Sequence, residues 1–226
     1  LSIQSTQTIY LCVFAILVGS ITLLMKCLSI TLFALHRELR HKYILFMALD
    51  FGEAINGIAF ITVGIGRLNL LLSDSIFKTI SVRRCLINKP WPIMLLIGAQ
   101  LPAILTILIS LERILAVIFP HLYSKLCGKY TKLMCIGVCA GTVSISVLIA
   151  YLVTENDREQ WKTQHCPIIS SVTKHYATAH FLFMFSAYTF SFSSLVILNI
   201  VQSRLNLSES IRKETRLTLY LCVTGK

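Results

Sequence analysis

Long apolar runs alternate with short polar segments along this chain. About 20 apolar residues in a helix are enough to cross the ~30 Å hydrocarbon core of a bilayer. Runs of this kind cover residues 9–30, 43–70, 92–119, 133–153 and 176–202, and a sixth run begins over 217–226. The runs are continuous rather than alternating, which disfavours a transmembrane barrel. The pattern therefore predicts an all-α membrane protein, a single helical bundle over residues 1–226 with five full spans and the start of a sixth.

The last run is short. About nine helical residues reach only about 14 Å, less than half of a bilayer. We therefore expect this chain to be part of a longer protein.

Composition supports the membrane assignment. The chain of 226 residues is 55% hydrophobic and only 14% charged, whereas a soluble domain averages about 25% charged residues. Mean hydropathy is +0.74. The net charge of +11 comes from basic residues between the apolar runs, where anionic lipid headgroups attract them. We therefore expect contact with membrane lipid and no nucleic acid partner.

The distribution of lysine and arginine predicts the orientation. Connectors after the first, third and fifth spans hold ten such residues, namely Arg37, Arg40, Lys42, Lys125, Lys129, Lys132, Arg204, Arg212, Lys213 and Arg216. The opposite connectors hold eight, namely Arg67, Lys78, Arg83, Arg84, Lys89, Arg158, Lys162 and Lys174. The positive-inside rule places the richer set in the cytoplasm, so the N-terminus is expected outside.

Two of the eight cysteines are candidates for a disulfide. Only Cys85 and Cys166 fall in the predicted outer connectors, and the others lie in apolar runs or in a predicted cytoplasmic connector. Disulfides persist in oxidising compartments and not in the cytosol. We predict a bridge between these two residues, and the alternative is a pair of unpaired loop thiols.

An acid and a base lie together where the third run ends. Glu112 and Arg113 follow an uncharged apolar stretch, and Pro120 stops the helix soon afterwards. The carboxylate is expected to hold the guanidinium in one rotamer and then release it to a cytoplasmic partner, a role that suits the rigid donors of arginine. The alternative is that the pair only marks the edge of the membrane.

Two further acids and one lysine lie inside apolar runs. Asp50 and Glu53 are three residues apart and so share one helical face, and carboxylates in lipid usually face the bundle interior. One interpretation is that they form an ion or proton switch. The alternative is that Glu53 is protonated and makes one interhelical hydrogen bond. Lys26 lies in the last turns of the first span, where its long stem can snorkel to the interface.

Gln100 lies in the middle of the third run. It faces a ligand cavity or bonds to a neighbouring helix, which contributes only about 0.6–2 kcal/mol in membranes. The histidines form no metal-ligand pattern and no Gly-rich phosphate loop is present, so we expect no metal and no cofactor.

Several motifs resemble rhodopsin-like G-protein-coupled receptors. The segment Glu112-Arg113-Ile114, with Pro120 and Tyr123 beyond it, resembles their Asp/Glu-Arg-Tyr signature. Gly19 lies where these receptors have Gly-Asn in helix one.

The second span adds to this resemblance. The run from Leu49 to Gly57 is similar to the family's Leu-x-x-x-Asp-Leu-x-x-Gly run, with Glu53 at the sodium-linked acid. The stretch 84–123 looks most like the nematode serpentine chemoreceptors of the sx class.

The resemblance implies a bundle of the seven-transmembrane receptor type in the plasma membrane. An unknown small-molecule or peptide ligand, expected to be a chemosensory cue, would bind outside and shift the bundle between two arrangements. The contact between Glu112 and Arg113 would loosen, and Arg113 would reach a heterotrimeric G protein. Pro120 and Tyr123 belong to the same coupling switch.

Two other classes compete with this interpretation. A membrane transporter or channel would use Asp50 and Glu53 as an ion or proton path, although the two halves of the chain show no internal repeat. A membrane-embedded enzyme would need a clustered set of acid, base or metal ligands, and these two acids are too sparse. We therefore expect no enzymatic activity.

Overall fold

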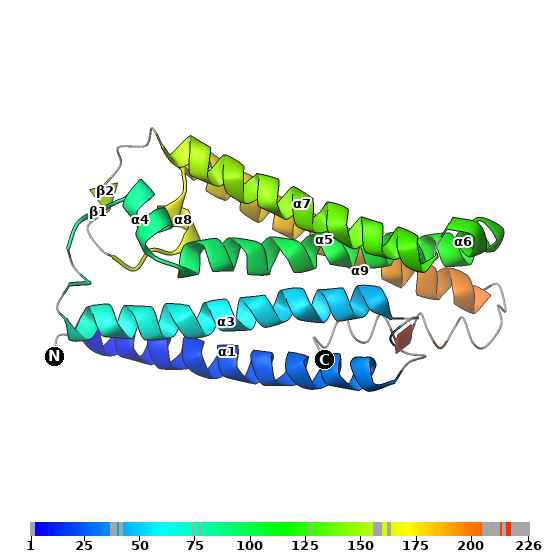
Figure 1. Cartoon of the computed structure of the whole chain (residues 1–226), viewed down its shortest axis with the longest axis horizontal. Coiled ribbons are helices and arrows are strands. Elements are labelled where there is room, and N and C mark those ends of the chain that lie inside the picture. Colours follow the sequence, from blue (N-terminus) through cyan, green and yellow to red (C-terminus); the bar gives the residue numbers. More distant parts are fainter. Residues whose placement is uncertain are drawn as a thin grey trace.

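The structure, a computed structural model, describes residues 3–36, 40, 43–73, 75–76, 78–126, 128–155, 160–161, 164–204, 213 and 216–217. Its long helices are α1 (Ile3–Leu35), α3 (Ile44–Leu72), α5 (Trp91–Ile118), α7 (Lys129–Thr154) and α9 (Lys174–Arg204). The short elements are α4 (Val82–Asn88), α6 (Pro120–Leu126), α8 (Ile168–Ser171), β1 (Ile80–Ser81) and β2 (Gln160–Trp161). Consecutive long helices run in opposite directions (Figure 1).

Among the described residues, five helices are long and apolar enough to cross a membrane. These stretches are Thr6–Leu35, Ile44–Leu72, Trp91–Ile118, Lys129–Thr154 and Lys174–Val201. Each of the five predicted spans coincides with one of these helices, and the largest difference is at the start of α1, which begins at Ile3 where the apolar run begins at residue 9. The expected sixth run, 217–226, lies outside the described residues apart from Leu217.

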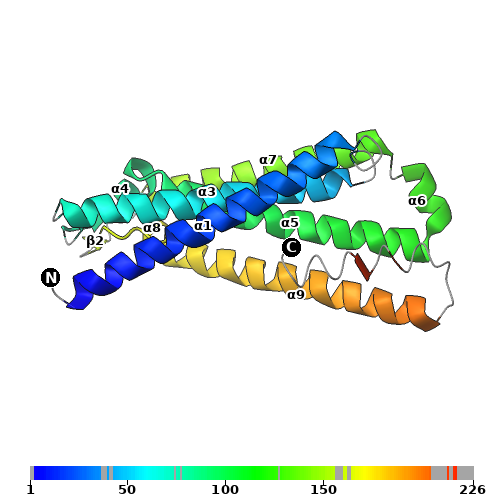
Figure 2. The same cartoon turned by 90° about the horizontal axis from the view of Figure 1, so that it is seen from below.

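Helix α5 is the central element of the bundle. It packs against α3, α7 and α9, and it lies between α3 and α7 in Figure 1 and next to α9 in Figure 2. In the most apolar 18-residue stretch of α5, 50% is buried inside the bundle, compared with 17% in the corresponding stretches of α1 and α7. Large apolar side chains such as Phe14 and Val138 are exposed on these two outer helices, as expected where a helix meets lipid.

Prolines define where α5 begins and ends. Pro90 is its N-cap, and Pro92 lies in its first turn, where a missing backbone N–H costs nothing. Phe119 leaves the helical conformation at φ −128° and ψ 64°, because the residue before a proline is disfavoured in the α region. Pro120 then begins α6, so it separates two helices as the sequence predicted.

The two ends of the bundle differ in structure. At one end, β1 pairs antiparallel with β2 and a disulfide joins Cys85 to Cys166; we call this the disulfide end. At the other end lie α6 and the last turns of α5, which contain Arg113. We call this the arginine end. Figure 1 shows them on the left and on the right, respectively.

Candidate functional site

At the arginine end, a buried carboxylate joins three helices. The side chain of Glu112 is 8% exposed and forms an ion pair with Lys132 of α7. It also accepts a hydrogen bond of 3.1 Å from the hydroxyl of Tyr123 in α6. Because Pro120 turns the chain into α6, Tyr123 lies back against α5, eleven positions after Glu112.

Arg113 makes different contacts from those expected. The sequence predicts that its guanidinium pairs with Glu112, but the ion pair and hydrogen bond described for that carboxylate go to Lys132 and Tyr123. Arg113 is 7% exposed, and its guanidinium lies 5.9 Å from the ring centroid of Phe46 in α3. The reason is geometric, because adjacent residues of a helix do not face the same direction.

Lys26, Asp50 and Glu53 form a second charged cluster, between α1 and α3. The Lys26 ammonium donates a hydrogen bond of 3.1 Å to Asp50 Oδ1 and forms an ion pair with Glu53. Ser29 donates to Asp50 Oδ2 at 2.5 Å. The Lys26 side chain is only 11% exposed, so the expectation that it snorkels to the interface is wrong. Ion pairs with two carboxylates on one face of α3 hold it inside instead.

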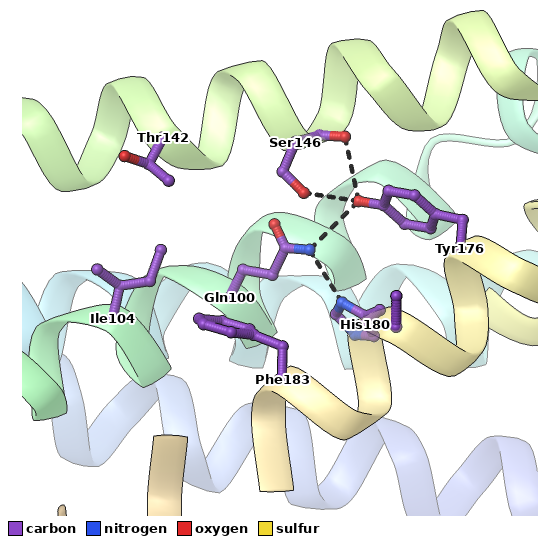
Figure 3. Close-up of a pocket in the computed structure, with 8 residues that line it drawn as sticks. Gln100, Ile104, Thr142, Ser146, Tyr176, His180 and Phe183 are labelled. Carbon is purple, nitrogen blue, oxygen red and sulfur yellow. Dashed lines mark hydrogen bonds between the residues drawn. The ribbon is translucent and has the colours of Figure 1, made fainter. Parts of the chain in front are cut away.

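Gln100 lies in a polar network across the core, shown in Figure 3. It is 4% exposed, and its Nε2 lies 2.9 Å from His180 Nδ1 and 3.3 Å from the hydroxyl of Tyr176. That hydroxyl also lies 2.8 Å from the hydroxyl of Ser146 and donates to its carbonyl oxygen. The network therefore connects α5 to α7 and α9, which is the helix-bonding role considered for Gln100.

A cavity adjoins this network, and we call it the Gln100 crevice. It has a volume of about 230 Å³ and is lined by Gln100, Ile104, Thr142, Ser146, Tyr176, Ala179, His180 and Phe183. The Oε1 atom of Gln100 is buried without a hydrogen-bond partner. In Figure 3 this oxygen points toward α7, between Thr142 and Ser146.

At the disulfide end, described residues of both connectors pack against the helices, with Ile80 and Cys166 in one buried cluster with Val63 and Trp91. The predicted bridge between Cys85 and Cys166 is confirmed, with the two Cα atoms 5.5 Å apart. The indole of Trp91 donates to the Cys166 carbonyl at 3.1 Å. Cys166 has φ of 42°, an uncommon conformation for a residue other than glycine, and both contacts help to hold it there.

A hydrogen bond from Arg67 links α3 to the connector that contains His165 and Cys166. The Nε of Arg67 donates to the carbonyl of His165 at 2.7 Å. Partial burial, and then the positive charge of Arg67, lower the pKa of His165 below its usual 6.5. Both effects favour the neutral form of the imidazole.

Sequence reasoning missed several of these partners. Lys26 and Arg67 were visible as charges inside apolar runs, which is a recognised signal of a functional or structural partner in membranes. Lys132 and Trp91 gave no such signal, because both lie near a span end where polar or aromatic residues are ordinary.

Comparisons with known proteins give no further assignment. No protein-family model matches the chain, and no curated protein matches its sequence. The chemistry of the site is therefore the basis for a functional conclusion: a buried arginine and a restrained carboxylate at one end, and a polar crevice in the core.

Proposed function

We propose that this chain is the transmembrane part of a rhodopsin-like G-protein-coupled receptor, similar to nematode chemoreceptors. It would lie in the plasma membrane with its N-terminus outside and transmit binding of an extracellular ligand to a heterotrimeric G protein. The main observation in support of this proposal is that Glu112 and Arg113 lie on the central helix, at the end of the bundle opposite to the disulfide.

The disulfide supports this orientation. Disulfides form and persist outside the cytosol, so the disulfide end is the extracellular one and the arginine end is the cytoplasmic one. The connectors at the arginine end are also the richer in lysine and arginine, in agreement with the positive-inside rule. Arg113 is thus at the face that a G protein would meet.

The contacts of Glu112 suggest how α5, α6 and α7 are held together in the inactive receptor. In this arrangement the carboxylate fastens α5 to α7 through Lys132 and to α6 through Tyr123. Arg113 lies over Phe46 of α3. A ligand that binds better to a second arrangement of the helices shifts the population toward it. Separation of Glu112 from Lys132 and Tyr123 would release α7 and α6 from α5, and rotation of α5 would move Arg113 away from Phe46 toward the G protein.

Substitution of Arg113 tests this function. In cells expressing the full-length protein, Arg113→Ala should lower G-protein activation about tenfold or more at equal surface expression, because hydrogen bonds of a charged group contribute about 1.5–3 kcal/mol. Arg113→Lys should also be impaired, since lysine lacks the rigid fork of donors.

A matched control removes an exposed cation at the same end. Lys125 lies on α6 and is exposed, so Lys125→Ala should leave signalling close to that of the wild type. Unchanged signalling by Arg113→Ala, at normal surface expression, would refute the proposed mechanism.

An ion path through Asp50 and Glu53 is the competing hypothesis. Lys26 contacts both carboxylates, so a passing cation would have to displace an ammonium group that the chain itself supplies. This contact favours the receptor over a transporter or channel. Ligand-dependent current in vesicles without G protein would reverse that preference.

A further inference from the structure

We propose that the Gln100 crevice binds a small uncharged molecule with a hydroxyl group, such as an alcohol or a phenol, that enters from the bilayer. This inference rests on the proposed receptor function and names the chemistry and the place of its ligand.

The first argument is an acceptor without a donor. Gln100 is only 4% exposed, and its Nε2 is bonded to His180 and Tyr176 while Oε1 has no partner. A buried acceptor that is left without a donor destabilises the folded state. The oxygen points into the crevice (Figure 3), so a hydroxyl group placed there would remove this cost.

The second argument is the absence of charge in the lining. None of the eight described lining residues is Asp, Glu, Lys or Arg. A charged ligand would have no counter-ion there, and an unpaired charge in a low-dielectric site is strongly disfavoured. Ile104, Ala179 and Phe183 supply apolar wall for the rest of the molecule.

The third argument is size. The crevice measures about 230 Å³. A dry cavity of about 150 Å³ accepts benzene, whereas drug-sized ligands occupy about 300–1,000 Å³. A single substituted ring or a short branched chain is therefore the expected scale, and a peptide is too large.

The fourth argument concerns access. Thr142, Ala179 and Phe183 line the crevice and are exposed. They lie within the spanning stretches of α7 and α9, so in the membrane orientation proposed above these side chains would face lipid. A neutral molecule dissolved in the bilayer can therefore reach the mouth directly between these two helices.

Photolabelling tests the site without any G protein. The full-length protein in nanodiscs is labelled with 4-azidobenzyl alcohol, and the labelled peptides are mapped by mass spectrometry. Label should concentrate on the segments of α7 and α9 around Thr142 and Phe183. Benzyl alcohol should displace it at a roughly five- to tenfold lower bilayer concentration than toluene, the gain expected from one hydrogen bond of about 1–1.4 kcal/mol.

Two variants separate the hydrogen bond from the cavity. Gln100→Leu should make benzyl alcohol and toluene equally effective. Ala179→Leu fills the crevice without removing a polar atom and should abolish the displaceable label. Thr178→Leu adds the same bulk next to it on an exposed position outside the lining and should keep the label.

The outcomes are distinguishable from those of the coupling test. Equal displacement by both compounds in the wild type, or label spread over α7 and α9 and unaffected by Ala179→Leu, would overturn the inference. Failure of Arg113→Ala to alter signalling would count against the receptor mechanism while leaving this binding result intact.

Discussion

Two groups of charged side chains inside the bundle form ion pairs between helices. Lys132 and Glu112 join α7 to α5, with side chains 11% and 8% exposed. Lys26 joins α1 to two acids of α3. A charge that is buried without a partner is far more costly than one that is paired, so each pair constrains the relative rotation of the helices that carry it.

Loss of Lys132 should destabilise the arginine end. Lys132→Met leaves the Glu112 carboxylate buried with only the hydroxyl of Tyr123, and removal of one partner of a buried pair costs about 3 kcal/mol. Thermal unfolding in nanodiscs should show a lower melting temperature for this variant. Adding Glu112→Gln to it should restore part of the loss, because the uncompensated charge is then gone.

A lysine one turn earlier provides the control for this pair. Lys129 is exposed, so Lys129→Met should melt close to the wild type. If Lys132→Met and Lys129→Met melt alike, the ion pair of Glu112 does not stabilise the bundle.

His165 should make the stability of the disulfide end depend on pH. Its pKa in the folded protein is lowered from 6.5 by burial and by Arg67, so the unfolded chain binds the proton more tightly. Stability is therefore fully present above about pH 6.5 and is lost as pH falls through the folded-state pKa. Melting of the wild type at pH 7.5 and 5.5 should show a decrease on acidification that His165→Gln reduces. An identical decrease in both proteins would exclude this residue as the cause.

At the scale of elements, glycines set the distance between α1 and α3. A Cβ atom built on Gly19 would lie 2.6 Å from the carbonyl oxygen of Gly57, which is closer than real contacts allow. Small residues that bring backbones together are the usual means of packing helices in a membrane, because lipid removes the hydrophobic drive for association. The close approach also places Lys26 within reach of Asp50.

Gly19→Ala should therefore separate the two helices. Overpacking costs about 1–3 kcal/mol, and we expect a lower melting temperature and weaker expression at the cell surface. A Cβ atom added to Gly141 of α7 would meet no other atom within 4 Å, so Gly141→Ala should be neutral or slightly stabilising, as alanine is in a helix interior. Equal effects of the two substitutions would show that α1 and α3 are not closely packed at Gly19.

At the scale of the whole molecule, the bundle has two chemically different ends. One carries the disulfide, the strand pair and the indole of Trp91. The other carries α6, Arg113 and the ion pair of Glu112. The central helix α5 contributes to both ends and to the Gln100 crevice between them. A shift of α5 would therefore change contacts at both ends and in the crevice.

The orientation of these ends can be measured by labelling. Asn88 at the disulfide end and Ser124 on α6 are both exposed. In a background that lacks Cys127, an impermeant maleimide should label Asn88→Cys in intact cells and Ser124→Cys only after the membrane is opened. The reverse pattern would place Arg113 outside the cell and would refute the proposed coupling to a cytoplasmic G protein.

The spans and the disulfide were predictable because their determinants are local or compositional. A helix in lipid satisfies its hydrogen bonds within its own segment, so length and apolarity alone revealed five helices. The bridge followed from counting the cysteines that fall in one set of connectors. Pro120 and Phe119 likewise end α5 through the geometry of two adjacent residues.

The partners of the charged side chains depended on the tertiary structure. Glu112 and Arg113 are neighbours in the chain but face different helices, whereas Lys26 and Asp50 are 24 residues apart and touch. Such contacts depend on how each helix is rotated about its axis and how closely it packs against its neighbours. The position of an apolar run in the sequence predicts neither the rotation nor the packing distance. The sequence alone therefore determined that the described part of this chain forms five helices long and apolar enough to cross a membrane, and the packing of those helices decided which charges pair and where the crevice opens.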